Sequence, residues 1–503
     1  LASDRFHGLY RSTNGGTDWT RVSGPWEVFD RGRWDGSWPP PFLGPAVLRF
    51  SPTAPDTAIA VFRNYRLQRS RQAAFVSRDA GRTWQPLLNP VPPHLGTVID
   101  AVVSGQEPEA VLLATDTGFY AYRPGDPEPE QRHNWNDRTP RQFDCGRTGD
   151  TLICYLVAGA PGRKGNDLYL SADEGRTWEK RTPDPGTGLM AAGVCTNHAR
   201  TVYFSVADDN NRWNLPKPER RRRNEVTSRL YRTDDAFRTW RAVLHPHPDM
   251  DRYNVTAPYW GERAWGWHLP AKSIAVAADD PDVVIRPGNT RVYATDNGGQ
   301  TWTNISAPPL DADGCQPAGG MPIMSAWNYH VDPRFPRNHY ISMTDFSGWR
   351  SRDGGRTWCF GDPGNPFPHN WYDLVFDPAA PGRLWAAAAR HHDLPHPKFN
   401  GKGLRQPGGC VIRSDNHGAS WTPLGRDTGL PNVAVTDLAL DPDSPAGKRR
   451  LWAAALGEGL FVTDDAGKTW DRVDTGLRPE NPNMLRVHLD AHGRLWALTT
   501  WIV

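Results

Sequence analysis

One eight-residue pattern, Ser/Thr-x-Asp/Asn-x-Gly-x-Thr-Trp, recurs along the whole chain and constrains its fold more than any other feature. The 503 residues contain eight copies, which begin at Ser12, Ser77, Ser171, Thr233, Thr295, Ser351, Ser414 and Thr463. Trp closes every copy, Asp holds the third place in five copies and Asn holds it in three. Gly holds the fifth place in every copy except one, where Phe237 replaces it. A unit repeated this often predicts a repeat architecture rather than one very large core.

The repeated residues are those of a hairpin turn. A short Asp or Asn side chain accepts hydrogen bonds from backbone N–H groups of its own turn, and Gly supplies a positive φ. The Thr and Trp begin the next strand, and the Trp packs on the sheet of its own hairpin. We therefore predict that the box turns, as we call these eight turns, are structural and need no substrate.

A second pattern precedes most copies and completes the repeating unit. The segments LVFDPAAPGRLWAAA and YHVDPRFPRNHYISM each indicate a strand, an Asp-Pro turn and another strand. The unit is then four antiparallel strands, which we label A to D from the axis outward, with the box between C and D. Copies lie about 50 to 65 residues apart, and the one gap of 94 holds a unit without a box. Such a period predicts a β-propeller.

The expected fold is all-β, a single large propeller that spans residues 1–503. We count nine four-stranded blades and keep eight as the alternative. The ninth blade would close the ring by pairing the C-terminal segment 484–503 with the N-terminal segment 1–22. The chain begins at Leu1 rather than Met, which predicts a processed or trimmed N-terminus.

Composition excludes several classes of function. The net charge is +2, from 58 basic and 56 acidic residues, so no overall field favours nucleic acid. No apolar run approaches the roughly 18 residues of a membrane span. No sequence motif for a nucleotide, a zinc protease or a serine hydrolase is present, and we expect neither a cofactor nor a metal.

Six cysteines leave two pairings open. Cys145 and Cys154 flank one short turn, and Cys315 and Cys359 flank one predicted sheet. Each pair forms either a disulfide or two free buried thiols. Cys195 and Cys410 have no evident mate.

The repeated residues resemble the Asp-box, or BNR, repeat over nearly the whole chain. Families that carry it include sialidases, xyloglucan-active glycoside hydrolases, sortilin-type receptors and photosystem-assembly factors, so the repeat indicates fold more than function. The Asp-Pro strand links and the T-D-x-x-G turns are most similar to the xyloglucanase type. The Arg-Ile-Pro motif of sialidases is absent. This resemblance implies a propeller whose box turns lie away from the active site.

The long insertions all fall on the face opposite the box turns. They are D–A links (22–45 and 245–268) and B–C loops (63–72, 208–225 and 390–409). Such long loops are uncommon unless they have a function. Aromatic side chains among polar ones stack on sugar rings or pack on partner proteins. From these loops we single out Trp260, Trp265 and Trp267 as candidates for binding substrate.

Candidate catalytic residues lie on the same face. Asp345 occupies a B–C turn, and the xyloglucanase type places a catalytic Asp in a similar turn. His391 and Asp393 open a long B–C loop. Two predicted A strands, 325–333 and 369–378, bring further polar and aromatic side chains to the mouth of the channel. These are His330 and Asp373, as candidate catalytic groups, and Trp327, Tyr329, Trp371 and Tyr372, as candidates for binding substrate.

Three functional hypotheses remain open. The first is a secreted or extracytoplasmic glycoside hydrolase that uses two carboxylates as acid and base on a poly- or oligosaccharide. Asp345 is its first candidate, with Asp373 or Asp393 as partner. The second is a polysaccharide lyase that uses His330 or His391 with Tyr329 or Tyr372. The third is a non-catalytic propeller that binds a glycan or a protein. The oligomeric state is left open.

Overall fold

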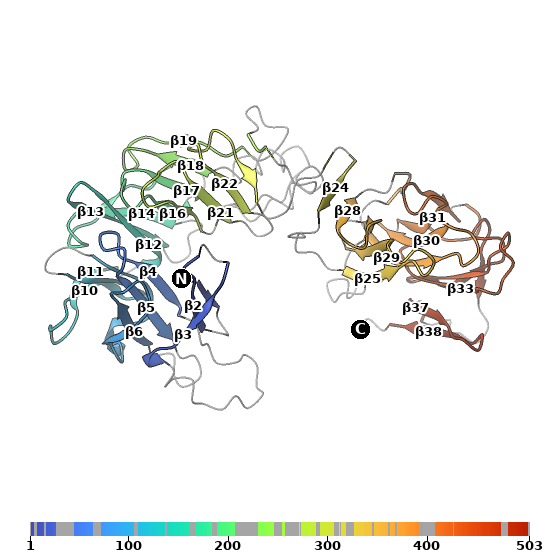
Figure 1. Cartoon of the computed structure of the whole chain (residues 1–503), viewed down its shortest axis with the longest axis horizontal. Coiled ribbons are helices and arrows are strands. Elements are labelled where there is room, and N and C mark those ends of the chain that lie inside the picture. The colour runs from blue at the N-terminus through green and yellow to red at the C-terminus, as the bar shows by residue number, and fades with distance from the viewer. Residues whose placement is uncertain are drawn as a thin grey trace. The chain divides into compact units, whose positions relative to one another are not determined.

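The structure, a computed structural model, describes most of the chain. The described residues are 2–4, 8–14, 17–26, 45–63, 72–104, 109–135, 138–159, 166–183, 189–206, 230–245, 254–256, 271, 273–287, 292–305, 311, 313–317, 326–344, 347–360, 363–367, 370–391, 394, 408–425, 427–473 and 481–500. Among them there is no α-helix, and antiparallel strands form the architecture (Figure 1). By contact the chain divides into two compact units, Leu1–Pro258 with Glu262–Ile305, and Tyr259–Gly261 with Ser306–Val503.

The first unit contains five consecutive four-stranded groups and a three-stranded N-terminal sheet. The N-terminal sheet has the strands β1 (Ala2–Asp4), β2 (Gly8–Arg11) and β3 (Thr20–Val22). The four-stranded groups are β4 (Val47–Phe50), β5 (Ala58–Arg63), β6 (Gln72–Ser77) and β7 (Gln85–Leu88); β8 (Val98–Val103), β9 (Val111–Thr115), β10 (Gly118–Tyr122) and β11 (Glu130–Asn134); β12 (Thr139–Thr148), β13 (Thr151–Gly159), β14 (Asn166–Ser171) and β15 (Glu179–Lys180); β16 (Leu189–Val194), β17 (Val202–Val206), β18 (Leu230–Thr233) and β19 (Arg241–Ala242); and β20 (Ala275–Val276), β21 (Val284–Pro287), β22 (Val292–Thr295) and β23 (Thr303–Asn304). A single 3₁₀ turn, η2 (Pro93–Leu95), precedes β8.

The second unit contains three further four-stranded groups. They are β25 (Ala326–Val331), β26 (His339–Met343), β27 (Gly348–Ser351) and β28 (Thr357–Phe360); β29 (Asn370–Phe376), β30 (Leu384–Ala389), β31 (Gly409–Ser414) and β32 (Thr422–Leu424); and β33 (Val435–Leu440), β34 (Leu451–Ala455), β35 (Gly459–Thr463) and β36 (Asp471–Val473). A fifth strand, β24 (Cys315–Pro317), joins the first of these groups, and β37 (Met484–Leu489) pairs with β38 (Leu495–Thr499).

The predicted four-stranded antiparallel unit is confirmed in these eight groups, and the strands of each follow one another in the chain. The number of blades in a closed ring stays a prediction. So does the closure itself, since β1–β3 and β37–β38 form separate sheets in different units.

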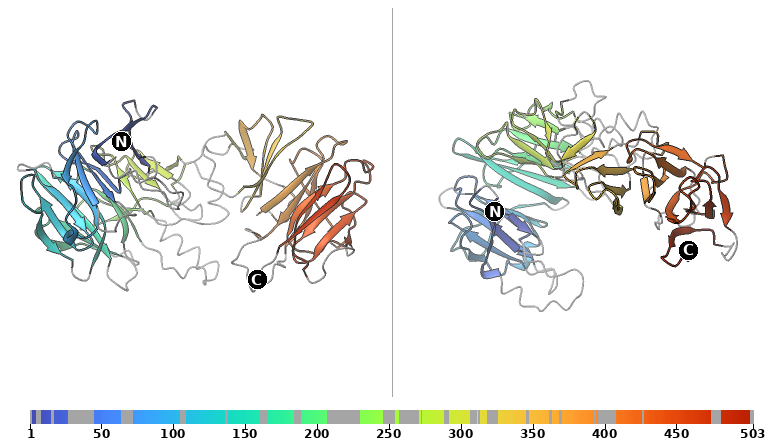
Figure 2. Two further views of the ribbon diagram at one scale, coloured as in Figure 1. Left: turned by 90° about the horizontal axis from the view of Figure 1, so that it is seen from below. Right: turned by 45° about the vertical axis from the view of Figure 1, so that its right-hand side comes forward.

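Successive sheets within each unit pack face to face through their first strands. In the second unit β25 contacts β29, β29 contacts β33 and β33 contacts β37, and Figure 2 shows these sheets side by side. Most core clusters join two such neighbours. Trp385 of one sheet, for example, packs in the same cluster as Phe461 of the next, and both are almost fully buried. The core therefore lies between sheets, because a four-stranded sheet cannot bury both faces alone.

The box turns have the hydrogen bonds that the sequence predicts. In the copy at Ser351, Asp353 Oδ1 accepts from the backbone N–H of Thr357 at 2.9 Å, and Asp353 Oδ2 accepts from the Thr357 hydroxyl at 2.7 Å. The Ser351 hydroxyl donates to Asp353 Oδ1 and accepts from the N–H of Gly355, whose φ is +86°. These bonds lower the pKa of Asp353 to about 2.

Two sequence exceptions within the boxes have simple physical explanations. Where Asn297 replaces Asp, its amide donates to the hydroxyl of Thr301 at 2.7 Å. The third and seventh residues of the box therefore remain hydrogen-bonded, but the side chain of the third residue is now the donor. Phe237, in place of Gly, adopts a φ of +68°, which is strained for a residue with a Cβ. Its ring is buried in the core between two sheets, and this burial offsets the strain.

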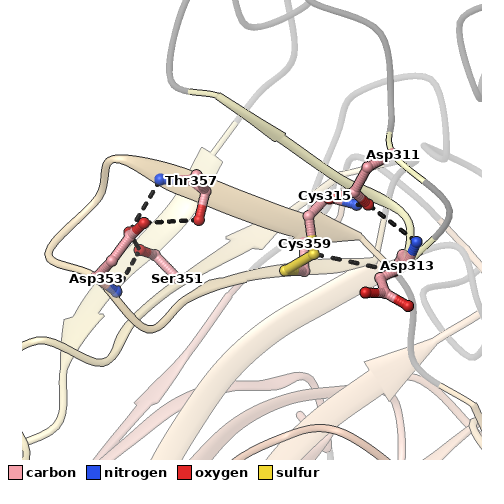
Figure 3. The surroundings of a disulfide bond; sticks show 7 residues. All are labelled: Asp311, Asp313, Cys315, Ser351, Asp353, Thr357 and Cys359. Atoms are coloured by element: carbon pink, nitrogen blue, oxygen red, sulfur yellow. Dashed lines mark hydrogen bonds between the residues drawn. A yellow bond between two sulfur atoms is a disulfide. The ribbon is translucent and has the colours of Figure 1, made fainter.

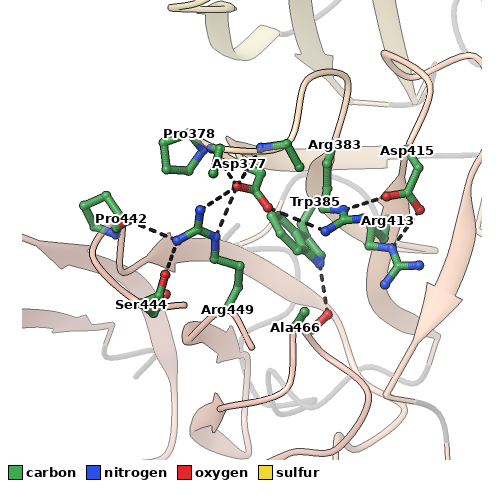
Figure 4. Close-up of polar contacts among 12 residues, drawn as sticks. Asp377, Pro378, Arg383, Trp385, Arg413, Asp415, Pro442, Ser444, Arg449 and Ala466 are labelled. Carbon is green, nitrogen blue, oxygen red and sulfur yellow. Dashed lines mark hydrogen bonds and ion pairs between the residues drawn. The ribbon is translucent and has the colours of Figure 1, made fainter. Parts of the chain in front are cut away.

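Hydrogen bonds between Asp-Pro turns join neighbouring sheets at the ends of their strands where the A–B turns lie. The buried guanidinium of Arg449, from the β33–β34 turn, donates from Nε and Nη2 to Asp377 Oδ1 at 3.1 and 2.8 Å (Figure 4). Asp377 lies in the β29–β30 turn and also accepts from the N–H of Ala379. Charge-assisted bonds between buried partners of two sheets fix how those sheets pack.

One of the two predicted cysteine pairs forms a disulfide, and the other does not. Cys315 and Cys359 form a disulfide that attaches β24 to the outer edge of β28, beside the Asp353 box (Figure 3). Cys145 and Cys154 face each other directly on β12 and β13 and are free, buried thiols. Cys195 and Cys410 are also buried and form no disulfide.

The box geometry leads to a stability prediction for Asp353→Ala. The change removes the acceptor for four donors of one turn and should lower the free energy of unfolding by about 1 kcal/mol. Thermal or denaturant unfolding measures this loss. Asp353→Asn is the matched control and should lose less, because Asn serves in three natural copies. Selective loss of ligand binding or turnover in a stably folded Asp353→Ala protein would contradict the structural role.

Candidate active site

Each first strand of the second unit carries a polar residue directly after a one-residue bulge. The register shifts lie between Ala326 and Asn328 in β25, Trp371 and Asp373 in β29, Val435 and Asp437 in β33, and Met484 and Arg486 in β37. A bulge re-aims the side chain that follows it. Because these four strands are neighbours, the four residues form a continuous set, which we call the A-strand row: Asn328, Asp373, Asp437 and Arg486.

The members of the A-strand row bind one another and the next strand. Asn328 Nδ2 lies 3.3 Å from Asp373 Oδ1, and the backbone N–H of Leu438 donates to Asp373 Oδ2 at 3.3 Å. Asp437 Oδ2 accepts from the N–H of Val487 at 2.8 Å, and Arg486 Nη1 donates to Asp437 Oδ1 at 3.3 Å. Each carboxylate therefore joins its own strand to the first strand of the following sheet.

In the first unit, other side chains join neighbouring first strands in the same way. Gln142 follows a bulge in β12, and its Oε1 accepts from the N–H of Ala192 in β16 at 3.0 Å. Asp144, two residues further on, accepts from the N–H of Val194 at 3.1 Å. Asp100 follows the bulge in β8 and receives two bonds from Arg49 of β4. Joining neighbouring first strands is thus a general feature of the fold.

Burial controls protonation in the A-strand row. Desolvation raises the pKa of Asp373 well above its usual range, and the nearby charge of Asp437, with which it shares a hydrogen bond, raises it further. Burial also lowers the pKa of His330 to about 4, with Arg486 adding to the shift. His330 Nε2 lies 3.6 Å from Asp373 Oδ1. With a pKa of about 4 the imidazole is neutral at neutral pH, so this contact is not an ion pair.

This pair does not have the geometry of a glycosidase acid and base. The two carboxyls of such enzymes lie about 5–5.5 Å apart when retaining and about 6.5–9.5 Å apart when inverting. A hydrogen bond brings Asp373 and Asp437 closer than either spacing. The sequence analysis did not single out Asp437, although YDLVFDP at 372–378 and TDLALDP at 436–442 carry an Asp at the same place.

Two aromatic residues fix the segments that lead to the predicted catalytic loops. Trp327 Nε1 donates to the hydroxyl of Thr344 at 2.9 Å, and the Trp327 ring contacts the ring of Tyr372 at 5.1 Å. The Tyr372 hydroxyl donates to the carbonyl of His391 at 2.8 Å and lies 3.3 Å from the backbone N of Leu394. We call Trp327 and Tyr372 the aromatic anchor. Their contacts hold Thr344, His391 and Leu394 near one another.

The remaining predicted residues of the first strands have contrasting environments. Trp371 is buried in the core, where its ring meets Trp421 edge to face at 4.6 Å. A Cβ at Gly348 would lie 1.9 Å from the Trp371 ring, so only Gly fits against it. Tyr329 is 56% exposed, with its hydroxyl 2.5 Å from His339 Nδ1. Trp371 and Tyr372 are therefore packed inside the second unit, and a role of Tyr329 in binding stays a prediction.

Five predicted site residues lie outside the described residues and stay predictions. They are Asp345, Asp393, Trp260, Trp265 and Trp267. The described part of the chain contains no group of three His, Cys, Asp or Glu side chains that could hold a metal ion. No helix in that part is long and apolar enough to cross a lipid bilayer.

The raised pKa of Asp373 leads to a pH prediction. An acid whose pKa is raised on folding stabilises the protein fully below its unfolded pKa of about 4 and loses this contribution as the pH rises through the folded pKa. The Asp373→Asn side chain resembles a protonated carboxyl but cannot ionise. The variant therefore does not lose this stability as the pH rises. The melting temperature of the variant, relative to the native chain, should therefore increase between pH 5 and pH 8.

A matched control is Asp353→Asn, at a carboxyl whose pKa is lowered to about 2. Asp353 is ionised throughout that range whether the chain is folded or unfolded, so the variant should shift the melting curve by a constant amount. Parallel pH curves for Asp373→Asn and the native chain would show that Asp373 is ionised in the fold.

Comparison with known proteins gives a distant sequence match and a shared fold. No protein-family model matches the chain. A xyloglucanase from a Paenibacillus species is 25% identical over 355 residues, which cover 58% of this chain and 29% of that protein. The chain thus spans less than a third of the length of this curated relative.

Among solved structures, an ancestral GH74 enzyme matches with a TM-score of 0.56 and 15% identity, over 91% of this chain and 63% of the other. The GH74 xyloglucanase from Xanthomonas campestris matches over 99% of this chain and 94% of the other, at 14% identity and a TM-score of 0.37. The chain therefore has a β-propeller fold like that of GH74 enzymes, and in sequence it is distantly similar to a xyloglucanase.

Proposed function

We propose that this protein is a secreted or extracytoplasmic glycoside hydrolase that cleaves a polysaccharide of the xyloglucan class. The sequence match to a xyloglucanase, together with the GH74-like fold, carries this proposal. The disulfide between Cys315 and Cys359 supports an oxidising compartment, because such bonds persist there. The curated relative is much longer than this chain, so the activity of the isolated chain has to be measured.

Asp345 and Asp393 are our proposed acid and base. Each lies next in sequence to a residue held by the aromatic anchor, Asp345 after Thr344 and Asp393 before Leu394. One carboxyl would protonate the leaving oxygen, and the other would act as nucleophile or activate water. Asp393 is a better partner than Asp373, because Asp373 is buried and already bonded to Asp437 and Leu438.

The exposed Tyr329 and the predicted Trp260, Trp265 and Trp267 would supply the binding surface. Aromatic rings stack on the apolar faces of sugars, and neighbouring polar groups bind the hydroxyls. Xyloglucan is a neutral polymer, which suits a chain with a net charge of only +2.

A non-catalytic binding propeller is the second candidate. It is favoured by the A-strand row, in which the described carboxyls are used to join strands. The lyase hypothesis gains no such support. The Tyr372 hydroxyl is bonded to two backbone groups, and His330 is partly buried beside Asp373.

The proposal predicts that the chain releases reducing ends from xyloglucan. Asp345→Asn and Asp393→Asn should each fold with an unchanged melting temperature and lose activity by about 100-fold or more, as expected for loss of an acid or base. Reducing-end assays on xyloglucan, mixed-linkage glucan and carboxymethylcellulose measure this. Asp353→Asn, on the opposite face, is the control and should keep full activity. Binding of xyloglucan without any hydrolysis would contradict the hydrolase proposal and support the non-catalytic binding propeller.

A further inference from the structure

A cavity of about 660 Å³ opens in the first unit at the A–B ends of its strands, the ends where the box turns lie. Five consecutive sheets contribute to it, through β4, β8 and β12 and through the turns that follow β16 and β20. Its size lies within the range of roughly 300–1,000 Å³ that is typical of small-molecule sites. It is separate from the aromatic anchor and the A-strand row, which belong to the second unit.

The wall of this cavity offers a hydrogen-bond donor that the fold does not use. Arg49 donates from Nε and Nη2 to Asp100, and Nη2 also lies 3.2 Å from the carbonyl of Phe143. Its Nη1 is 3.9 Å from Asp144 Oδ1, beyond hydrogen-bonding distance. Among the described residues, the buried Nε of Arg147 has no hydrogen-bond partner. That nitrogen has almost no accessible surface, so the donor that the wall offers to a molecule in the cavity is Nη1 of Arg49.

The charges of the wall balance one another. Arg49 and Arg147 face Asp144 and Asp279, two cations against two acids. The pKa of Asp144 is itself raised by burial. A wall without net charge does not concentrate anions or cations, which argues for a neutral ligand.

An aromatic ring and small polar groups complete the wall. Phe50 is 41% exposed, an unusual position for so large an apolar side chain. Asn197 and Asp279 are exposed and hydrogen-bonded to each other, and Thr53 lies at the β4–β5 turn. Donors and acceptors alternate around an exposed ring, and hydroxyl groups match such a wall because each one both donates and accepts.

We propose that this cavity is a second, non-catalytic site that binds a short neutral saccharide. The Phe50 ring packs against the apolar face of the sugar. Nη1 of Arg49 donates to its hydroxyls, and Asp279 and Asp144 accept from them. This site lies in the first unit, at the ends of the strands where the A–B turns of five consecutive sheets meet.

Calorimetric titration of the whole chain tests the proposal. The probes are cellohexaose, the xyloglucan heptasaccharide and mannohexaose, added to Asp345→Asn protein so that no substrate is turned over. Phe50→Ala and Asn197→Ala in this background should each weaken binding of the preferred probe by at least tenfold. Both side chains are exposed, so both variants should keep the parent melting temperature. Ile285→Ala, at an exposed apolar residue outside the cavity, is the matched control and should bind as the parent does.

The outcomes separate this site from the proposed active site. Phe50→Ala made in the native chain should keep its rate of hydrolysis on short oligosaccharides, whereas Asp345→Asn should keep binding at the cavity. Unchanged titrations for both cavity variants, or no binding of any of the three probes, would overturn the second site. Tighter binding of an oligogalacturonate than of all neutral probes would overturn the assignment to a neutral sugar. Neither result depends on whether the chain hydrolyses xyloglucan.

Discussion

The first strand of each four-stranded group is an edge strand, except for β16, which pairs with β14 at one end, so most of one side of its backbone has no strand partner. The structure satisfies those N–H groups with side chains from the preceding sheet. Asp373 accepts from Leu438, Asp437 from Val487, and Gln142 from Ala192. Apolar packing between sheets has no direction, whereas these bonds set the register of one first strand against the next. The arrangement of consecutive sheets in each unit depends on this contact.

The same contact limits where chemistry can occur. A carboxyl that accepts a backbone N–H of the neighbouring strand and shares a proton with a second carboxyl is held rigidly and shielded from water. Asp373 therefore has the raised pKa of a catalytic acid without the exposure that one needs. Catalysis requires groups that a substrate can reach. For this reason we assign the proposed acid and base to residues next in sequence to Thr344 and Leu394, which the aromatic anchor of Trp327 and Tyr372 holds.

The sequence predicts those features correctly in which a residue type at a given place in a local pattern has a single structural role. The box turns, the Asp-Pro turns and the four-stranded groups all follow from local patterns, and the Asn for Asp exchange keeps the same bridge with its donor reversed. It did not identify packing between sheets. Trp371 and Tyr372 look like a sugar platform in sequence, yet they fill two different inter-sheet cores. Alternation along a strand shows that a side chain points away from its neighbours, but not whether another sheet covers it. Asp345, Asp393 and the three loop tryptophans remain predictions.

The chemistry of Asp353 shows why the most repeated residue is not the catalytic one. Its two oxygens receive bonds from Ser351, Arg356 and Thr357, and these bonds hold its pKa at about 2. Such a carboxylate is a poor proton donor at any ordinary pH, because a general acid works best with a pKa near the working pH. A box also occupies the same C–D turn in sheet after sheet, whereas an active site needs unlike groups that meet at one place. The repeat therefore provides a regular frame, and we expect function at the positions where consecutive sheets differ.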